Sequence, residues 1–534
     1  MAFLSERIAG EWKRSVAWAL PARIAAPAFF ALLWAVSVAR IVTLLHGHFT
    51  YTLDDSYIEL ALAERLAQGF YGINFGEFSA PSSSIAWPFL LIPGAGTAWH
   101  QYLPLVLNFA FGAATAWLVG FMVDAWSWPR RDGWHALKPA ALACLTLVAT
   151  NAVGLALTGM EHSLQLLLAI IAAYAVLEAW HGKVVPAWCL WAVALSPLVR
   201  YEDFVLVAAL AATLIGQNRI KHAAGFFAAS LVLPSLFGVF LMWHGLPPLP
   251  TSVFVKTGGY SHEYGIVGNL LAIAGKLPAL LQRQREAWPV AALVVAFAAT
   301  LPLTRARGRA WIVLGCLAAC AAHLCFGRYG WFYRYEAYIV GFGLLVILGF
   351  ENRLATRWWP VTVLLLLYVA QPYVRGLIDI PGAARNIHEH QFQMHRFVHD
   401  YYKKSFAVND LGWVSFQLDP HVEVLDLGGL ASYEAARQEH KDWNWLDLIT
   451  RRERVGLVMI YPDWFEGIPA DWTPLAKLRL GSPLVVAGGD PLVIYATPNG
   501  NHAEILAELR DFARDLPSGE RIELADDPQR GLRP

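Results

Sequence analysis

Residues 24–45 read IAAPAFFALLWAVSVARIVTLL, an apolar run with a single charged residue, Arg40. A helix needs about 20 mostly apolar residues to cross the hydrocarbon core of a bilayer. The whole chain shares this character. Of its 534 residues, 57% are hydrophobic and 15% are charged, whereas soluble domains carry about 25% charged residues. This composition excludes a disordered chain, a disulfide-stabilised scaffold and an ordinary cytosolic enzyme.

Eleven segments of this kind are predicted to span the membrane. They are residues 24–45, 102–124, 137–157, 162–180, 185–199, 203–216, 222–243, 287–304, 310–326, 335–350 and 358–375. Basic residues cluster in the N-terminal segment and in the links after even-numbered spans, and the positive-inside rule assigns that side to the cytoplasm. The N-terminus is therefore expected in the cytoplasm and the C-terminus outside. The long outer loops, 46–101 and 244–286, are predicted to contain juxtamembrane helices.

The chain changes character near Arg385. From there to the end it has 16 Lys and Arg against 23 Asp and Glu, whereas the preceding part has 25 against 18. Runs of β-branched residues predict strands at 422–427, 455–461 and 492–496, and helices are predicted at 387–403 and 503–516. The prediction is a polytopic α-helical membrane domain, residues 1–380, followed by a soluble extracytoplasmic α/β domain, residues 385–534. The polar stretch from Pro517 is expected to be frayed.

Two adjacent carboxylates stand out in the first outer loop. Asp54 and Asp55 precede a predicted helix that Gly69 ends. A carboxylate at a membrane face can act as a general base, with its pKa tuned by burial and by its neighbour. Asp is also a common, solvated helix N-cap, and both interpretations stay open. Because adjacent carboxylates titrate as a pair, the sequence does not decide which of the two would be the base.

Other outer loops add charged candidates: Glu161, Arg200, Lys256 and Arg334. Charge at the membrane edge is costly and therefore indicates function, but Arg200 can also simply pair with Glu202 or Asp203. His162 and His323 are predicted to be hydrogen-bonded interface residues. No motif specifies a metal or a nucleotide. Carboxylates and cations on the outer face of an apolar bundle suit a lipid-phosphate substrate, whose phosphate would meet Arg or Lys.

The first outer loop carries a family resemblance. The run LDDSYIELALAERLAQGFYGINFGE (53–77), with the Ser-rich turn and the Trp-Pro segment after it, resembles the first outer loop of the GT-C superfamily of polyprenyl-phosphate-dependent glycosyltransferases. Within that superfamily the chain looks most like the terminal arabinofuranosyltransferase group. TGMEHSL, LVRYEDFVL, LPPLPTSVFVKTG and VNDLGWVSF…VLDLGGLAS resemble further motifs of that group in the same order. Tyr201, Glu202, Asp203 and Pro250 depart from the usual residues, which leaves the sugar open.

The resemblance implies an inverting glycosyltransferase. It would move a sugar from a polyprenyl-phosphate donor to a glycan or glycolipid acceptor, at the outer face of a bacterial inner membrane. Asp54 matches the base, with Asp55 assisting it. The donor cavity would be lined by Glu161, Arg200, Lys256, Arg334 and Tyr57, with Arg200 and Lys256 expected at the phosphate. A divalent cation is left open, and no nucleic-acid partner is expected.

The outer domain would help to bind the acceptor. Its Asn409, Asp410 and Asp426 are expected to stabilise turns rather than to take part in chemistry. The main alternative function is a carrier or flippase for lipid-linked sugars, which would favour internal repeats and charges near the bilayer midplane. A structural protein whose tail recruits envelope partners is a third possibility, but it gives no reason for Asp54 and Asp55 beside an apolar cavity.

Overall fold

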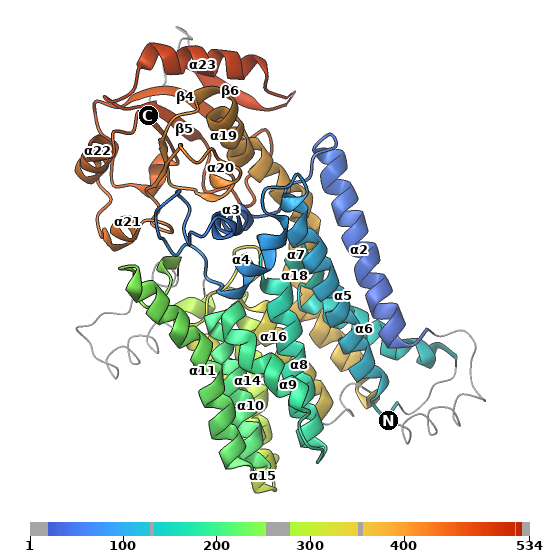
Figure 1. The fold of residues 1–534 in the computed structure, drawn as a ribbon. Coiled ribbons are helices and arrows are strands. Elements are labelled where there is room, and N and C mark those ends of the chain that lie inside the picture. The colour runs from blue at the N-terminus through green and yellow to red at the C-terminus, as the bar shows by residue number, and fades with distance from the viewer. Residues whose placement is uncertain are drawn as a thin grey trace.

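The computed structural model of the chain describes residues 20–128, 133–252, 278–282, 284–350, 356–517 and 519–525. A bundle of helices forms one part of the molecule, and a C-terminal part that contains a sheet covers one end of it (Figure 1). The helix α3 (Asp55–Ala67) of the first outer loop lies between the two parts.

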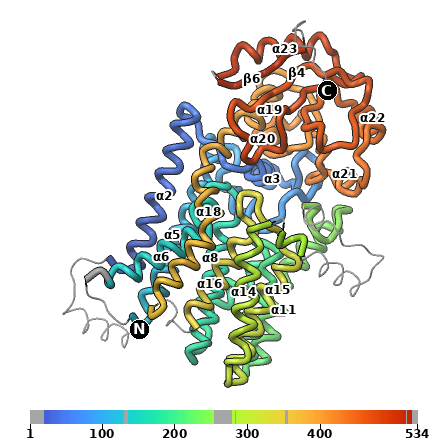
Figure 2. Tube along the Cα trace, turned by 180° about the vertical axis from the view of Figure 1, so that it is seen from behind, coloured from blue at the N-terminus to red at the C-terminus, as the bar shows by residue number. Residues whose placement is uncertain are grey.

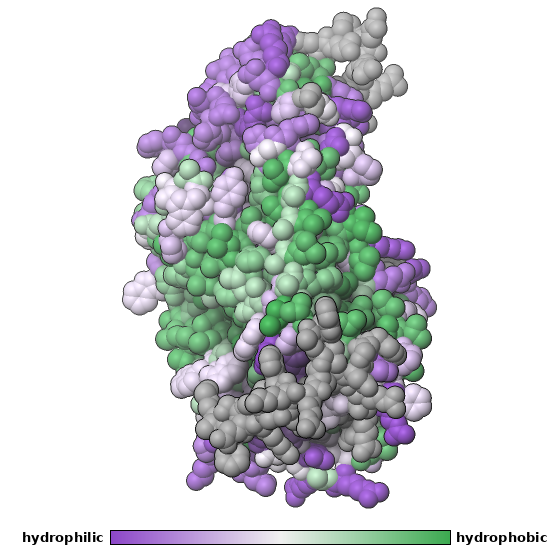
Figure 3. Space-filling view, turned by 90° about the vertical axis from the view of Figure 1, so that its right-hand side faces the viewer, coloured by the Kyte–Doolittle hydropathy of each residue, from purple (hydrophilic) through white to green (hydrophobic). Residues whose placement is uncertain are grey.

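Every predicted span is helical in the structure. The helices are α2 (Ala22–Leu44), α5 (Leu103–Asp124), α6 (Lys138–Ala149) with α7 (Ala152–Ala156), α8 (His162–Trp180), α9 (Ala187–Val199), α10 (Phe204–Gly216), α11 (Ile220–Trp243), α14 (Ala287–Thr300), α15 (Arg307–Phe326), α16 (Ala337–Phe350) and α18 (Trp359–Ile387). Among the described residues, 6 helical segments are long and apolar enough to cross a membrane, and four apolar helices are shorter. Their outer surface is a broad hydrophobic belt below the polar C-terminal part (Figure 3). The chain is therefore a helical membrane protein, while the number of spans stays a prediction.

The first outer loop joins the two parts of the molecule. Besides α3 it contains α4 (Ala86–Leu91) and the short helices η1 (Ile92–Gly94) and η2 (His100–Tyr102), so helices are present in this loop as predicted. Most of the second predicted outer loop, residues 253–277, lies outside the described residues. Tyr57 and Leu60 belong to the core of the bundle, whereas Ile58 and Ala61 belong to the core of the C-terminal part. Adjacent faces of one helix are thus buried against different domains, which fixes α3 and the aspartates at its start.

The C-terminal part contains a mixed sheet with the strand order β2-β1-β3-β5-β4-β6. The strands are β1 (Phe406–Val408), β2 (Val424–Asp426), β3 (Leu457–Ile460), β4 (Thr473–Arg479), β5 (Leu492–Ala496) and β6 (Arg521–Leu524). β1 pairs in parallel with β2 and β3, and the other pairings are antiparallel. The remaining helices include α20 (Gly412–Ser415), α21 (Tyr433–Arg437), α22 (Trp443–Arg452) and α23 (His502–Arg514).

Three predicted strands and the helix at 503–516 are confirmed. β1, β4 and β6 were not predicted, and the expectation of fraying from Pro517 is wrong for 521–524, because these residues pair with β4. The last span differs too. α18 continues beyond residue 375 to Ile387, and η7 (His388–Phe392), α19 (Gln393–Arg396) and η8 (Phe397–Tyr402) prolong it. One continuous helical segment therefore leads from the bundle into the C-terminal part (Figure 2).

Candidate functional site

Asp54 connects the first outer loop to the C-terminal part. It precedes α3, but its side chain makes no capping bond to that helix. Its Oδ2 accepts the Gly412 N–H at 2.7 Å and its Oδ1 accepts the Trp413 N–H at 2.8 Å, both at the start of α20. Only 6% of Asp54 is exposed. The interpretation of Asp54 as a solvated N-cap is therefore wrong, since its carboxyl group is buried in the contact between the two parts.

The surroundings of Asp54 raise its pKa. Burial is the largest cause and the neighbouring Asp410 carboxyl adds to it, while the Trp413 N–H acts in the opposite direction. The pKa of Asp410 is raised as well, again mainly by burial, although the Gln391 amide, which donates to its Oδ2 at 2.6 Å, lowers it. Two carboxyl groups this close cannot both ionise easily, so Asp54 and Asp410 titrate as a pair.

Asp55 has a different environment from Asp54. Arg334 Nη2 donates to Asp55 Oδ2 at 2.6 Å and to the Tyr335 hydroxyl at 2.8 Å. Burial alone would lower the pKa of Arg334, but Tyr335 and Asp55 raise it, so the guanidinium stays charged. The Asp55 side chain is 25% exposed. Asp55 is thus the more accessible of the two adjacent carboxylates, and it faces a fixed cation.

The loop that carries Arg334 has a strained backbone. Trp331, Phe332 and Tyr333 all have positive φ angles, of 47°, 64° and 58°. Left-handed backbone costs roughly 1–2 kcal/mol per residue for side chains with a Cβ. The Asn151 side-chain amide donates to the Phe332 and Tyr333 carbonyls at 3.3 Å and supports the turn. Strain that the surrounding structure maintains is common at ligand sites.

Arg200 is buried between two glutamates. Its Nη1 donates to Glu161 Oε1 at 2.9 Å and to Ser83 Oγ at 2.8 Å. Its Nε and Nη2 donate to the two carboxylate oxygens of Glu202 at 3.1 and 2.7 Å. Of the two candidate partners, Glu202 and Asp203, Arg200 pairs with Glu202. Asp203 instead accepts the Gln165 amide at 2.8 Å.

Tyr335 brings these groups together. The Arg334 guanidinium carbon lies 4.8 Å from the centroid of its ring and that of Arg200 lies 5.7 Å from it. We call Asp55, Arg334, Tyr335, Arg200 and Glu161 the outer polar cluster. Asp55 starts α3, Glu161 immediately precedes α8, Arg200 immediately follows α9, and Arg334 and Tyr335 lie in the loop before α16. The cluster therefore forms at helix ends.

Other predicted site residues lie elsewhere. Tyr57 stacks on Trp413, with ring centroids 3.7 Å apart, in the same contact that buries Asp54. It is therefore placed beside Asp54 rather than in the outer polar cluster. Lys256 lies outside the described residues. His323 shares a hydrogen bond of 3.1 Å with the Tyr338 hydroxyl, as predicted for an interface histidine.

The turn residues of the C-terminal part have diverse roles. Asp426 accepts the N–H groups of Gly428, Gly429 and Ala431, which confirms its expected role in a turn. Asp410 belongs instead to the contact with Asp54, so its assignment to a turn was incomplete. The sequence showed no signal for this, because the two residues meet only through the docking of the C-terminal part.

Some polar contacts in the site were not predicted from the sequence. Glu59 accepts the Ser82 hydroxyl at 2.7 Å, and Gln391 donates to both Asp410 and the Tyr461 hydroxyl. The Ser-rich turn at 82–84 was the available signal, since its serines face Glu59 and Arg200.

Several buried oxygen atoms near the outer polar cluster have no hydrogen-bonding partner among the described residues. They are Glu161 Oε2, Asp203 Oδ2, Ser163 Oγ and the Tyr201 hydroxyl. Buried polar groups are normally satisfied, so these atoms are candidates for contacts with a bound ligand or with water. Within the described ranges no group of three or more His, Cys, Asp or Glu side chains could hold a metal ion. A divalent cation therefore stays open.

Comparisons with known proteins give one match. Residues 385–495 match the model of a domain of unknown function (DUF8728). No curated protein and no solved structure matched the chain.

Proposed function

We propose that the protein is a membrane glycosyltransferase of the GT-C type, which moves a sugar from a polyprenyl-phosphate donor to a glycan or glycolipid acceptor of the cell envelope. The observation that carries this proposal is the convergence of Asp55, Arg334 and Arg200 around Tyr335. A carboxylate next to two buried guanidinium groups combines a proton acceptor with a phosphate-binding site. The resemblance of the first outer loop supports the same reaction.

The proposed step is a single displacement. The acceptor hydroxyl attacks the anomeric carbon of the donor and Asp55 takes the proton of that hydroxyl. The bond between the anomeric carbon and the phosphate oxygen breaks, and polyprenyl phosphate leaves with both electrons. Arg334 and Arg200 stabilise the negative charge that grows on the phosphate oxygen. Unpartnered oxygens such as Glu161 Oε2 would accept hydroxyl groups of the sugar.

The geometry favours Asp55 over Asp54 as the base. Both oxygens of Asp54 already accept backbone N–H groups, and the side chain is covered by Trp413 and Tyr57. A base must reach the proton that it removes. In this proposal Asp54 positions α3 and holds the C-terminal part in place.

The position of the charges favours a transferase over a carrier. Asp55, Glu161, Arg200 and Arg334 all lie at helix ends or in loops. Arg334 bonds to Asp55, and the adjacent Asp54 bonds to the C-terminal part. A carrier would be expected to hold its substrate near the bilayer midplane. The proposed location is a bacterial inner membrane, with the N-terminus in the cytoplasm and the C-terminal part in the periplasm, where it would help to bind the acceptor.

Release of polyprenyl phosphate tests the proposal. The purified full chain is reconstituted with a panel of polyprenyl-phosphate sugars and an envelope glycan extract. Asp55→Asn should lower release by about 100-fold or more, the range of general base catalysis. Glu77→Gln is the matched control, because Glu77 is an exposed carboxylate of the same loop. Equal release by wild type and Asp55→Asn would remove Asp55 from the base role. Movement of the donor across the bilayer without any release would favour the carrier.

A further inference from the structure

A separate groove lies where α2 and α18 meet the C-terminal part. It has a volume of about 780 Å³ and is formed by the end of α2, the junction of α18 with η7, and the loop before β6. Cavities of about 300–1,000 Å³ are typical of small-molecule sites. None of its lining residues belongs to the outer polar cluster, so the groove is independent of the proposed function.

One wall of the groove is amphipathic. Val36, Arg40 and Leu44 follow one another at intervals of four along α2 and line the groove together. Residues at this spacing share one face of a helix. Val36 is 46% and Leu44 37% exposed. The wall therefore presents apolar surface with one cation in its middle.

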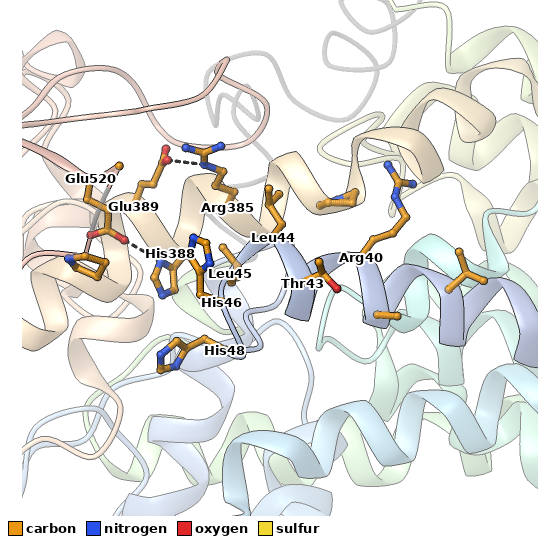
Figure 4. A pocket seen from close by; sticks show the side chains of 15 residues that line it. Arg40, Thr43, Leu44, Leu45, His46, His48, Arg385, His388, Glu389 and Glu520 are labelled. Atoms are coloured by element: carbon orange, nitrogen blue, oxygen red, sulfur yellow. Dashed lines mark hydrogen bonds and ion pairs between the residues drawn. The ribbon is translucent and has the colours of Figure 1, made fainter.

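The polar groups of the groove are unevenly paired. Arg385 donates to Glu389 at 2.6 Å and His388 Nδ1 lies 2.9 Å from Glu520 Oε1. Arg40 makes only a long bond, 3.5 Å to the Ile378 carbonyl, among the residues that the structure describes. In Figure 4 Arg40 and His388 lie at opposite ends of the groove. Arg40 therefore has no carboxylate partner among the described residues.

His388 provides a second polar group without a full set of hydrogen bonds. Its side chain is 8% exposed, and its Nε2 is buried without a hydrogen-bonding partner in the described part of the chain. With Nδ1–H donated to Glu520, Nε2 of the neutral ring accepts a hydrogen bond from a hydroxyl group, and Nε2 of the charged ring donates one to a phosphate oxygen. Either way the ring can bind a polar ligand at the end of the groove opposite Arg40.

We propose that this groove binds an anionic glycerophospholipid from the leaflet on the side of the C-terminal part. Its phosphate would pair with Arg40, for which a guanidinium is well suited. Its polar headgroup would reach His388, and its acyl chains would lie along the apolar face of α2 that contains Val36.

Native mass spectrometry of the full chain in detergent tests the site. The probe is dioleoylphosphatidylglycerol, compared with dioleoylglycerol, which lacks the phosphate, and with glycerol phosphate, which lacks the chains. We expect the complete lipid to bind at least about tenfold more tightly than either fragment. Arg40→Gln should weaken it by about tenfold, because hydrogen bonds to charged groups contribute this much.

Two further variants complete the design. Arg375→Gln is the matched control: Arg375 is an exposed arginine of α18 that does not line the groove, and binding should stay unchanged. Ala39→Trp puts a bulky ring on an exposed lining position and should weaken the complete lipid and dioleoylglycerol alike. Equal effects of Arg40→Gln and Arg375→Gln, or equal binding of dioleoylglycerol and the phospholipid, would overturn the proposal. Neither result would bear on the glycosyltransferase reaction.

Discussion

The Asp54 carboxylate accepts the backbone N–H of Trp413 at 2.8 Å, although 359 residues separate the two in the chain. The neighbouring Gly412 N–H bonds to the other carboxylate oxygen, and the Trp413 ring stacks on Tyr57. The start of α3 and the start of α20 therefore hold each other in place. This contact decides how the C-terminal part sits over the outer polar cluster.

Removing the Asp54 carboxylate should loosen the C-terminal part. Asp54→Ala leaves the Gly412 and Trp413 N–H groups buried without acceptors, which costs about 1–3 kcal/mol for each buried group. Trypsin should then cut faster after Lys403 and Lys404, which are exposed at the entry to the C-terminal part. Asp463→Ala, at an exposed aspartate of the same part, should leave the cleavage rate unchanged. Equal rates for both variants would show that the bonds to Asp54 do not hold the two parts together.

Gly412→Ala should also loosen the C-terminal part, because the added methyl group would clash with Asp54. A Cβ at Gly412 would overlap the main-chain oxygen and the carboxyl group of Asp54. Gly382→Ala is the control, since a Cβ there meets only Val485 at an ordinary contact distance of 3.4 Å. Because both changes break one contact, the double variant Asp54→Ala/Gly412→Ala should be cut by trypsin about as fast as either single variant. Additive rates would contradict a shared mechanism.

The docking of the C-terminal part should depend on pH through Asp410. Burial raises the pKa of Asp410 to about 6, above about 3.9 in an unfolded chain. Because the raised pKa means that the folded state binds the Asp410 proton more tightly than the unfolded chain, this proton stabilises the folded state. The stabilisation is complete below pH about 4 and is lost as the pH rises through about 6. Thermal unfolding of wild type should therefore show lower stability at pH 7.5 than at pH 5.

Asp410→Asn should weaken this dependence but not abolish it, because burial raises the pKa of Asp54 as well. The amide keeps the shape of the side chain and stays neutral, so it can accept from Gln391 while donating to Asp54. We expect the free energy of unfolding at pH 7.5 to increase by about 1–2 kcal/mol, since one pKa unit corresponds to about 1.4 kcal/mol. This value is discounted because Asp410 is only partly buried. Asp463→Asn serves as the control. A pH profile that Asp410→Asn leaves unaltered would place the titration elsewhere.

Removing only one member of the buried pair of Arg200 and Glu161 should destabilise the protein more than removing both. Arg200→Gln leaves the fully buried Glu161 without its cation, and breaking a buried pair costs about 3–5 kcal/mol. Arg200→Gln/Glu161→Gln should recover most of that loss in thermal unfolding. Arg452→Gln breaks the exposed pair with Glu434, and should cost at most about 1 kcal/mol. Full stability of the single variant Arg200→Gln would mean that the buried pair adds nothing to the fold.

Local patterns predicted much of the architecture. The apolar segments became helices, and 492–496 became β5 with the predicted bounds, because burial and β-branched residues act over short stretches. Strands β1, β4 and β6 escaped prediction, whereas the short strands β2 and β3 lie within longer runs of β-branched and apolar residues, 422–427 and 455–461. α18 extends past its predicted end because Pro381 is accommodated inside the helix and Ala383 and Ala384 pack in the bundle core.

By itself the sequence determined a helical membrane protein with an acidic C-terminal part and a pair of aspartates at the start of an outer helix. Only the tertiary structure decided that Asp54 faces the C-terminal part while Asp55 faces Arg334. The reason is physical. Helix formation and membrane insertion depend on neighbours within a few turns, which a linear pattern records. The environment of a carboxylate depends on groups that arrive from hundreds of residues away, and these meet it only when the domains pack.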